Sequence, residues 1–267
     1  MTPQAWIDGR LAPLDEAALP LLTDGLLRGD GGFETIGVWS GRPFRLEAHL
    51  DRLDASLAAL ELPPPDRPRL RAAVEELLAE APGEDAALRC YVLAGGTHIV
   101  TLDSQPVRPD IASLVTQPAP WIRPLGSYGP AGAKTLSYAP NMAALRRARA
   151  AGADDALLVS LEGWVLEGTT FAVLWVRDGV LRAPDLGLGV IDSISRGALL
   201  EMAADQGIAV EQGRWPLADL AEATEVLVSS SVRPCTAIRQ VDDWRFDGPE
   251  PVCRMLAPLL EAARHAG

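Results

Sequence analysis

Residues 131–141 read AGAKTLSYAPN and hold Lys134, the one lysine of the chain. The sequence has 24 basic residues, so all the others are arginine. Arginine can replace lysine wherever a positive charge is enough, but it cannot give up its proton and attack a carbonyl group. A single lysine in a chain that otherwise uses arginine is therefore a candidate nucleophile. The alternative is a surface lysine that was retained by chance.

A phosphate-binding loop does not explain this lysine. The lysine of such a loop follows a glycine directly, and a second glycine stands five residues before the first. Here these positions are Ala133 and Tyr128, and Pro140 interrupts the helix that should follow. The second functional interpretation is a lysine that forms a Schiff base in a partly dry pocket, since its neighbours in the sequence are mostly apolar and none is acidic.

Composition and charge narrow the class of protein. Hydrophobic residues make up 48% of the 267 residues, which supports one large domain or two small ones with a sizeable core. The formal net charge of -12 argues against a nucleic acid or an anionic membrane as partner. We expect no signal peptide and no membrane span, because the N-terminus lacks a basic start and no apolar run is long enough.

Cysteines and histidines suggest neither a disulfide framework nor a metal site. Cys90, Cys235 and Cys253 are odd in number, widely spaced and without a CxxC pair, which predicts reduced thiols in a cytoplasmic protein. His98 and His265 have no partner at the spacing of metal ligands, so we expect no metal.

The first part of the chain mixes strands with helices. Residues 33–39 favour a strand, and leucines spaced four and three residues apart from Leu46 to Leu60 indicate an amphipathic helix. A second helix follows, and then two predicted strands, 88–94 and 111–116.

Residues 118–133 are rich in proline and glycine, show no periodicity and predict a linker. We therefore expect a small α/β domain over residues 1–118, an interdomain linker over 119–133 and a large cofactor-binding α/β domain over 134–267. A segment that joins two domains is a common place for a ligand cleft.

Short strands dominate the second half. Helices are predicted over about 141–151, 196–206, 216–222 and 249–265, with strands DALLVS, GWVLEG, FAVLWV, GVLRAP, one after the second helix, 225–230 and one near 237–241. Because these strands mostly follow one another instead of alternating with helices, the pattern indicates an α+β fold.

Five stretches in a fixed order carry a resemblance to a known family. They are DGLLRGDGGFET from residue 24 with HLDRL from 49, KTLSYAPN from 134, GADDALLVSLEGWVLEG from 152, SISR from 193 and VLVSSSVRP from 226. Together they resemble the class IV aminotransferase family, the fold-type IV pyridoxal phosphate enzymes. The resemblance covers nearly the whole chain. It implies a two-domain α+β fold with pyridoxal 5′-phosphate in the interdomain cleft, a small amino substrate and a homodimer.

The resemblance also implies roles for particular residues. Lys134 would be the Schiff-base lysine and proton shuttle, and Glu167 would face the pyridine nitrogen. The other cofactor contacts would surround the phosphate and the phenolic oxygen: Arg52, Ile194, Ser195, Ser231 and Tyr138. Free amides and hydroxyls at the start of the helix after Ser193 suit a phosphate independently of the resemblance.

The substrate side departs from the family pattern. D-amino acid aminotransferases carry a carboxylate-binding arginine where this chain has Ala94, so Arg233, in the expected loop SSSVRP, is the substitute. Phe33 is either a core residue or the ring that lines the substrate side. The short chain and the stretches RGDGGFET and AKTLSYAPNMAAL look most like the lyase-type members of the family, and the missing arginine favours the same reaction. The resemblance therefore implies 4-amino-4-deoxychorismate lyase, which forms p-aminobenzoate and pyruvate. The alternatives are a transaminase of D-amino or branched-chain amino acids and, less favoured, a non-catalytic pyridoxal phosphate-binding relative.

Overall fold

The computed structural model of the protein describes residues 2–20, 22–106 and 110–266. The chain divides into two compact units, the first made of Met1–Val107, Ala133–Tyr138 and Ala263–Gly267, the second of Arg108–Gly132 and Ala139–Ala262. This division differs from the expected one at several points. Residues 119–132, expected as a linker, belong to the second unit, and Ala263–Gly267 belong to the first. Strand β7 (Ser113–Pro118) pairs with strands of the second unit. The segment that contains Lys134 belongs to the first unit, because it bonds to a strand there.

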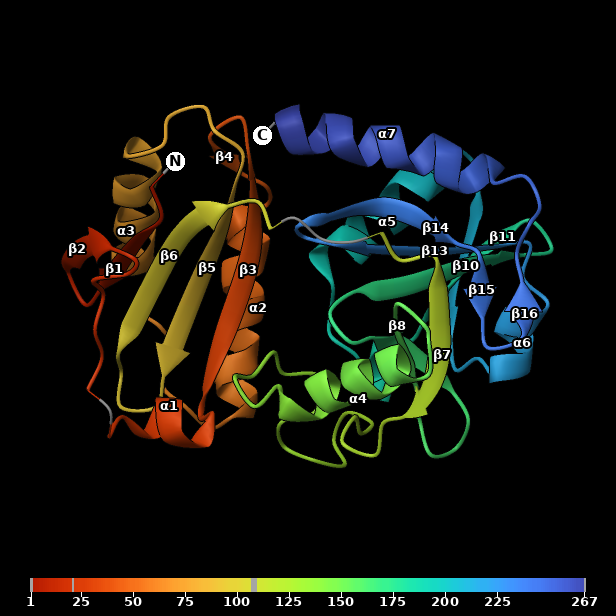
Figure 1. The fold of residues 1–267 in the computed structure, drawn as a ribbon, viewed down its shortest axis with the longest axis horizontal. Helices are drawn as coiled ribbons and strands as arrows, with labels where there is room; N and C mark the ends of the chain where they lie inside the picture. Colours follow the sequence, from red (N-terminus) through yellow and green to blue (C-terminus); the bar gives the residue numbers. More distant parts are fainter. Residues whose placement is uncertain (1, 21, 107–109, 267) are drawn as a thin grey trace. The chain divides into compact units, whose positions relative to one another are not determined.

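In the described part of the chain, the first unit is built on an antiparallel sheet of six strands (Figure 1). From one edge to the other these are β2 (Arg10–Pro13), β1 (Gln4–Ile7), β6 (His98–Ser104), β5 (Ala86–Leu93), β3 (Gly31–Trp39) and β4 (Arg42–Pro43). In the pairing of β3 with β5, Phe33 lies opposite Tyr91 and Thr35 opposite Arg89. Since side chains alternate along a strand, these four lie on one face of the sheet.

Helices α2 (Leu46–Ala59) and α3 (Arg67–Ala79) cover the other face of this sheet. The leucine stripe of α2 faces inward, since Leu50, Leu53 and Leu57 are fully buried. They share one core with alternate residues of β3, β5 and β6, as the spacing of the leucines predicts. A short helix, α1 (Asp24–Arg28), precedes β3.

Gly29, which precedes β3, and Gly31, its first residue, allow the segment Ala133–Tyr138 to lie against this strand. A Cβ at Gly31 would come 3.0 Å from Leu136 Cδ1 of this segment and 2.4 Å from the backbone oxygen of Val92 on β5. Gly29 has a φ of 65°, which a residue with a side chain rarely adopts, and a Cβ there would come 2.7 Å from Ser137 Oγ. The close approach is completed by the N–H of Leu136, which donates to Gly31 O at 2.9 Å.

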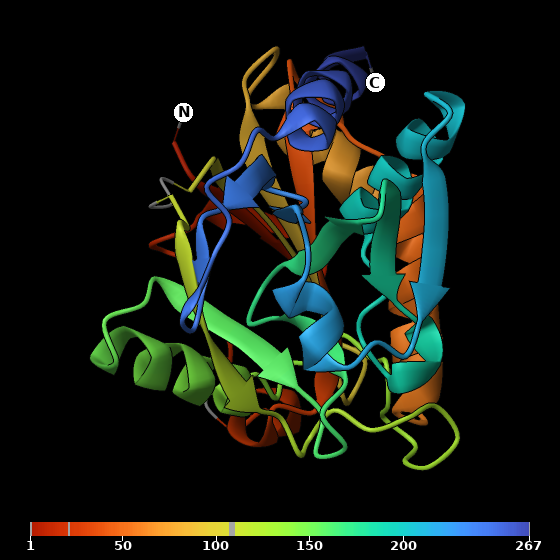
Figure 2. The same cartoon turned by 90° about the vertical axis from the view of Figure 1, so that its right-hand side faces the viewer.

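Within residues 110–262, the second unit contains two sheets of five strands each (Figure 2). The first sheet has the order β12 (Ala209–Gly213), β11 (Val180–Pro184), β10 (Ala172–Arg177), β13 (Glu225–Ser230) and β14 (Arg233–Ile238). The second has the order β16 (Trp244–Arg245), β15 (Gln240–Val241), β7, β8 (Asp155–Val159) and β9 (Val165–Gly168). Most strand pairs are antiparallel, and β11–β12, β7–β8 and β7–β15 are parallel.

The helices of this half are α4 (Ala139–Ala150), η1 (Leu186–Leu188), α5 (Ile194–Asp205), α6 (Leu217–Ala221) and α7 (Pro251–Ala266). One core of the unit centres on the fully buried Trp175 of β10, whose ring meets Trp215 edge to face at 6.4 Å. The mixture of helices and consecutive strands confirms the α+β prediction.

The structure adds elements that the sequence pattern did not predict. Strands β1, β2 and β6 were not expected, and β14 begins at Arg233, which the sequence placed in a loop. Among residues 2–20, 22–106 and 110–266, no helix combines the length and the hydropathy that a membrane crossing requires.

Candidate functional site

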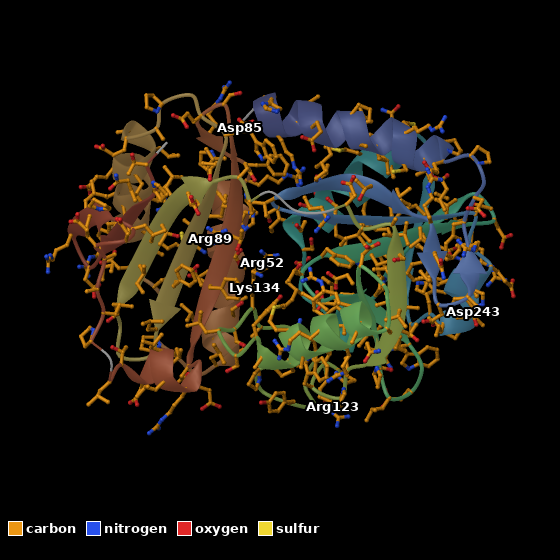
Figure 3. The ribbon with its side chains drawn as sticks, in the orientation of Figure 1. Arg52, Asp85, Arg89, Arg123, Lys134 and Asp243 are labelled. Carbon is orange, nitrogen blue, oxygen red and sulfur yellow. The ribbon has the colours of Figure 1, made fainter. Side chains whose placement is uncertain are left out.

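Lys134 is held through its backbone by both layers of the first unit. Its N–H donates to Ser56 Oγ on α2 at 3.0 Å, and its carbonyl accepts the N–H of Phe33 on β3 at 3.1 Å. Ser56 is 2% exposed, and its hydroxyl donates to the carbonyl of Arg52 one turn earlier at 2.9 Å. The position of Lys134 is therefore set by residues that are far away in the sequence. Figure 3 shows Arg52 and Lys134 next to each other on this unit.

The side chain of Lys134 lies against aromatic rings. Nζ is 4.1 Å from the ring centre of Phe33 and 5.4 Å from that of Tyr138. The Phe33 ring meets Tyr138 edge to face at 5.5 Å and stacks on Tyr91 at 6.0 Å. The structure thus brings together three residues predicted for the site, Lys134, Phe33 and Tyr138. Such a surface suits a flat ligand with a π system beside the amine.

Arg52 forms a buried cluster with two residues that the sequence did not assign to the site. Its Nε donates to Glu34 Oε1 at 2.8 Å and its Nη2 to Glu34 Oε2 at 2.6 Å. His49 Nδ1 lies 2.7 Å from the same Oε2. The Glu34 side chain is fully buried, and those of His49 and Arg52 are 1% and 9% exposed.

The charges in this cluster follow from burial and pairing. Burial acts to raise the pKa of Glu34, but the charge and hydrogen bonds of Arg52, with the bond from His49, lower it to about 2. Burial lowers the pKa of His49 despite the Glu34 carboxylate, and the charges of Arg52 and Lys134 act in the same direction. At neutral pH His49 is therefore neutral. Its Nδ1–H donates to Glu34, because an ionised carboxylate only accepts.

The face of the same sheet that is opposite α2 and α3 carries a cation that the sequence analysis passed over. Arg89 is half-buried on β5, two residues from Tyr91 and on the same face (Figure 3). It makes no hydrogen bond or ion pair with any described residue. The signal that could have found it is the alternation of β5, in which Leu88, Cys90 and Val92 face the core and leave Arg89 on the side of Phe33.

Glu167 lies in the second unit, at the end of β9. Its Oε2 accepts the N–H of Ile191 at 3.1 Å, and the residue borders a small pocket with walls that are mostly apolar. The lining residues are Leu166, Glu167, Ala172, Val173, Pro184, Val190, Ile191 and Arg196. A Cβ at the next residue, Gly168, would come 2.0 Å from the ring of Phe171. A side chain at Gly168 would displace this ring, so glycine lets Phe171 pack against the end of β9.

The start of α5 presents backbone donors close to this pocket. Ser193 is the N-cap, and its hydroxyl accepts the N–H of Arg196 at 3.3 Å. Ile194 and Ser195 follow in the first turn, and Ser195 is 1% exposed. Arg196 is buried and binds Pro184 O and Gln212 Oε1 through Nη2, which ties the helix start to β11 and β12. The first turn of a twelve-residue helix fixed in this way suits an anion.

Ser231 and Arg233 lie at the turn between β13 and β14. Arg233 is 7% exposed, and its charge acts on Asp155, whose pKa burial raises. Asp155 also accepts the hydroxyl of Thr169 at 2.6 Å. Arg233 is thus far less accessible than a loop position implies. No group of three or more His, Cys, Asp or Glu side chains within residues 2–20, 22–106 and 110–266 is placed to hold a metal ion.

Comparison with known proteins finds one family throughout. The family model described as amino-transferase class IV matches residues 31–241. A bifunctional aminodeoxychorismate lyase / D-amino acid transaminase of Mycobacterium tuberculosis is 33% identical, over 96% of this chain and 97% of that protein. The aminodeoxychorismate lyase of Bacillus subtilis is 27% identical, over 89% and 87%. A Mycobacterium tuberculosis structure described as a hypothetical aminotransferase in its PLP-bound form superposes with a TM-score of 0.89, at 31% identity, covering 98% and 99% of the two chains.

Proposed function

The chain belongs to the class IV aminotransferase family of pyridoxal phosphate enzymes, and on that premise we propose that it is a 4-amino-4-deoxychorismate lyase that also transfers amino groups from D-amino acids. The observation that carries the proposal is the placement of Lys134, whose amine lies over aromatic rings while its backbone is bound on two sides. The choice of reaction is supported by the bifunctional relative, to which this chain is 33% identical.

The residues present fit the cofactor of this family. Pyridoxal phosphate needs an amine for its aldehyde carbon, a carboxylate for its pyridine nitrogen and donors for its phosphate. Lys134 offers the amine, Glu167 is a carboxylate at an apolar pocket, and the capped start of α5 offers donors. When bound, the cofactor supplies a ring that draws electrons from the carbon next to the substrate nitrogen.

In this proposal each residue performs one task. Lys134 Nζ removes the proton from the carbon that bears the substrate amine and returns it later in the reaction. Glu167 keeps the pyridine nitrogen protonated, and Tyr138 contacts the phenolic oxygen. The phosphate is bound by four residues: Arg52, Ile194, Ser195 and Ser231. The buried hydroxyl of Ser195 and the backbone N–H groups of the first turn of α5, with a guanidinium, suit charge-assisted bonds to a phosphate.

The lyase reaction needs no co-reactant. Loss of the proton from the ring carbon that bears the amine and cleavage of the neighbouring ring C–O bond release enolpyruvate and make the ring aromatic. Return of one proton to the methylene carbon of the enolpyruvate gives pyruvate beside p-aminobenzoate. The substrate has two carboxylates. We assign one to Arg89, which lies on the Phe33 face, and keep Arg233 as the partner of the other.

The test is product analysis with single substrates. We expect purified protein loaded with cofactor to release equimolar pyruvate and p-aminobenzoate from 4-amino-4-deoxychorismate. D-alanine with a 2-oxo acid should react more slowly. Turnover of D-amino or branched-chain amino acids without any release of p-aminobenzoate would replace the lyase proposal with the transaminase alternative. No reaction in either assay, although cofactor binds, would favour a non-catalytic relative.

We also propose that the enzyme is a cytoplasmic homodimer. Large apolar side chains are exposed around α1, where Leu22, Leu26 and Leu27 are 83%, 54% and 56% exposed, and such patches mark contact surfaces. Light scattering of the wild type should give the mass of two chains. The variant L26E/L27E should shift toward one chain, and a wild type that is monomeric at micromolar concentration would contradict the proposal.

A further inference from the structure

Glu34 is a fully buried carboxylate for which the proposed reaction has no step. It lies on β3, and its two oxygens take three hydrogen bonds from side chains of α2, two from Arg52 and one from His49. A carboxylate has about four sites for hydrogen bonds, so most of its capacity is used by this one helix face. Ser56, one turn beyond Arg52, continues the same row toward Lys134.

The two hydrogen bonds from Arg52 to Glu34 fix the orientation of the guanidinium group as well as its distance from the carboxylate. The guanidinium group is planar and rigid, so binding both Nε and Nη2 to one carboxylate sets the plane of the group and the direction of its remaining edge. A single bond would leave the group free to turn about its long side chain. Glu34 therefore determines where Arg52 directs the donors that Glu34 itself does not take up.

The same contact also compensates the charge of Arg52. Glu34 is ionised and His49 is neutral, so the cluster of Glu34, His49 and Arg52 carries no net charge. An anion near Arg52 then meets oriented donors rather than an isolated cation. The effects of charge and of orientation can be separated by removing the charge of Glu34. If the net charge of the cluster decides, anion binding should become stronger. If the orientation of Arg52 decides, anion binding should become weaker.

We propose that Glu34 is a positioning residue for phosphate recognition, which holds the guanidinium of Arg52 in the one orientation that binds the cofactor phosphate. The inference rests on the proposed role of Arg52 in the function above. We expect orientation to decide, because a guanidinium group binds a phosphate best through two parallel N–H groups that are held in place. The charge of Glu34 matters less, because it is buried against the charge of Arg52.

The experiment compares two ligands that differ only in the phosphate. Full-length protein stripped of cofactor is titrated with pyridoxal 5′-phosphate and, separately, with pyridoxal, and both dissociation constants are measured by absorbance. We expect Glu34→Gln to weaken pyridoxal phosphate binding by about tenfold or more, the range for a lost charge-assisted bond, and to leave pyridoxal binding unchanged. Unchanged or tighter binding of pyridoxal phosphate would overturn the inference, as would an equal loss for both ligands.

A matched control removes a buried carboxylate elsewhere. Glu225 is 2% exposed and accepts the N–H groups of Val252 and Cys253 at the start of α7. Glu225→Gln should leave the ratio of the two dissociation constants at the wild-type value. If Glu34→Gln does not fold, Glu34→Asp keeps the charge but withdraws the oxygens from Arg52. It should lower the phosphate preference, and a retained preference would overturn the inference.

Arg52→Lys separates this inference from the function on which it rests. Lysine keeps the charge but has no fork. If Arg52→Lys retains the full phosphate preference, Arg52 does not bind the phosphate and its proposed role fails. If Arg52→Lys loses the preference while Glu34→Gln keeps it, the role of Arg52 stands and the positioning role of Glu34 alone is wrong.

Discussion

Arg52 on α2 and Arg196 on α5 are both buried, but they are held in opposite ways. Arg52 binds a buried carboxylate through two donors. Arg196, 4% exposed, binds only neutral oxygens, and no described residue forms an ion pair with it. Burial lowers the pKa of Arg196, while the charges of Asp192, Asp185 and Glu167 act in the other direction.

This difference separates two uses of one residue type. The charge of Arg52 is compensated by the carboxylate that it binds. Its contribution is therefore the direction of its remaining N–H donors. Among the described residues, no carboxylate in contact with Arg196 compensates its charge. This charge therefore acts over a distance on Glu167, which lines the same pocket. In a region of low dielectric, two opposite charges attract each other more strongly than they do in water.

Neither arginine can replace the one lysine. Lys134→Arg and Lys134→Ala should both lower the turnover of 4-amino-4-deoxychorismate by at least about 10²–10⁴-fold, the usual contribution of a positioned acid–base group. Lys134→Arg keeps the cation over the Phe33 ring, so its failure would show that proton loss matters and not charge alone. Turnover within a fewfold of wild type in either variant, measured by release of p-aminobenzoate, would contradict the assignment.

Replacing the two arginines should lower the free energy of unfolding by different amounts. Arg52→Met leaves Glu34 as a buried carboxylate without its cation, which we expect to lower the free energy of unfolding by about 3–5 kcal/mol. Arg196→Met leaves only a carbonyl oxygen and an amide oxygen without their donor. We expect it to lower the free energy of unfolding by about 1–3 kcal/mol. Urea unfolding of the cofactor-free proteins measures both values. Equal losses, or a larger one for Arg196, would remove the distinction.

The motifs predicted much of the first region and less of the second. The leucine stripe defined α2, and the predicted residues Lys134, Phe33 and Tyr138 meet on the first unit. The pairing of Glu34 with Arg52 was not predictable, because it depends on how β3 packs against α2. A local pattern contains no information about such a contact.

Other differences have equally local causes. The segment around Lys134 leaves the linker for the first unit because its backbone bonds to β3, which glycine at position 31 permits. Arg233 was expected in a loop, but Ser231 and Val232 are enough for the turn, so β14 begins at Arg233 and the side chain is buried. Strand β6 was missed because burial does not alternate along it: Val100, Thr101 and Leu102 are all buried, and only pairing with β5 shows which of them face the core.

The anchor of Lys134 on α2 should have a smaller effect than either arginine. Ser56→Ala removes the acceptor of the Lys134 N–H, and we expect it to lower the free energy of unfolding by about 1 kcal/mol and turnover by about tenfold or less. Ser137→Ala is the control, since its exposed hydroxyl binds Gly29 O from the same segment. A Ser137→Ala enzyme that loses as much turnover as Ser56→Ala would show that the effect is not specific to the anchor.

The smallest expected effect concerns pH. Because burial lowers the pKa of His49 in the folded state, the unfolded chain binds its proton first as the pH falls below about 6.5, and stability is lost in that window. Asparagine at this position can still donate to Glu34 but does not titrate. We therefore expect the wild type to lose more unfolding free energy than His49→Asn between about pH 7 and pH 5. Identical pH profiles would mean that His49 is not held neutral.

The central claim is that Lys134 binds the cofactor covalently. Borohydride reduction of the cofactor-loaded protein followed by mass spectrometry tests it directly, because the chain has one lysine. We predict one phosphopyridoxyl group per chain, carried by the peptide that contains Lys134, and none on Lys134→Arg. An unlabelled wild-type protein, or a label that persists on Lys134→Arg, would contradict the account.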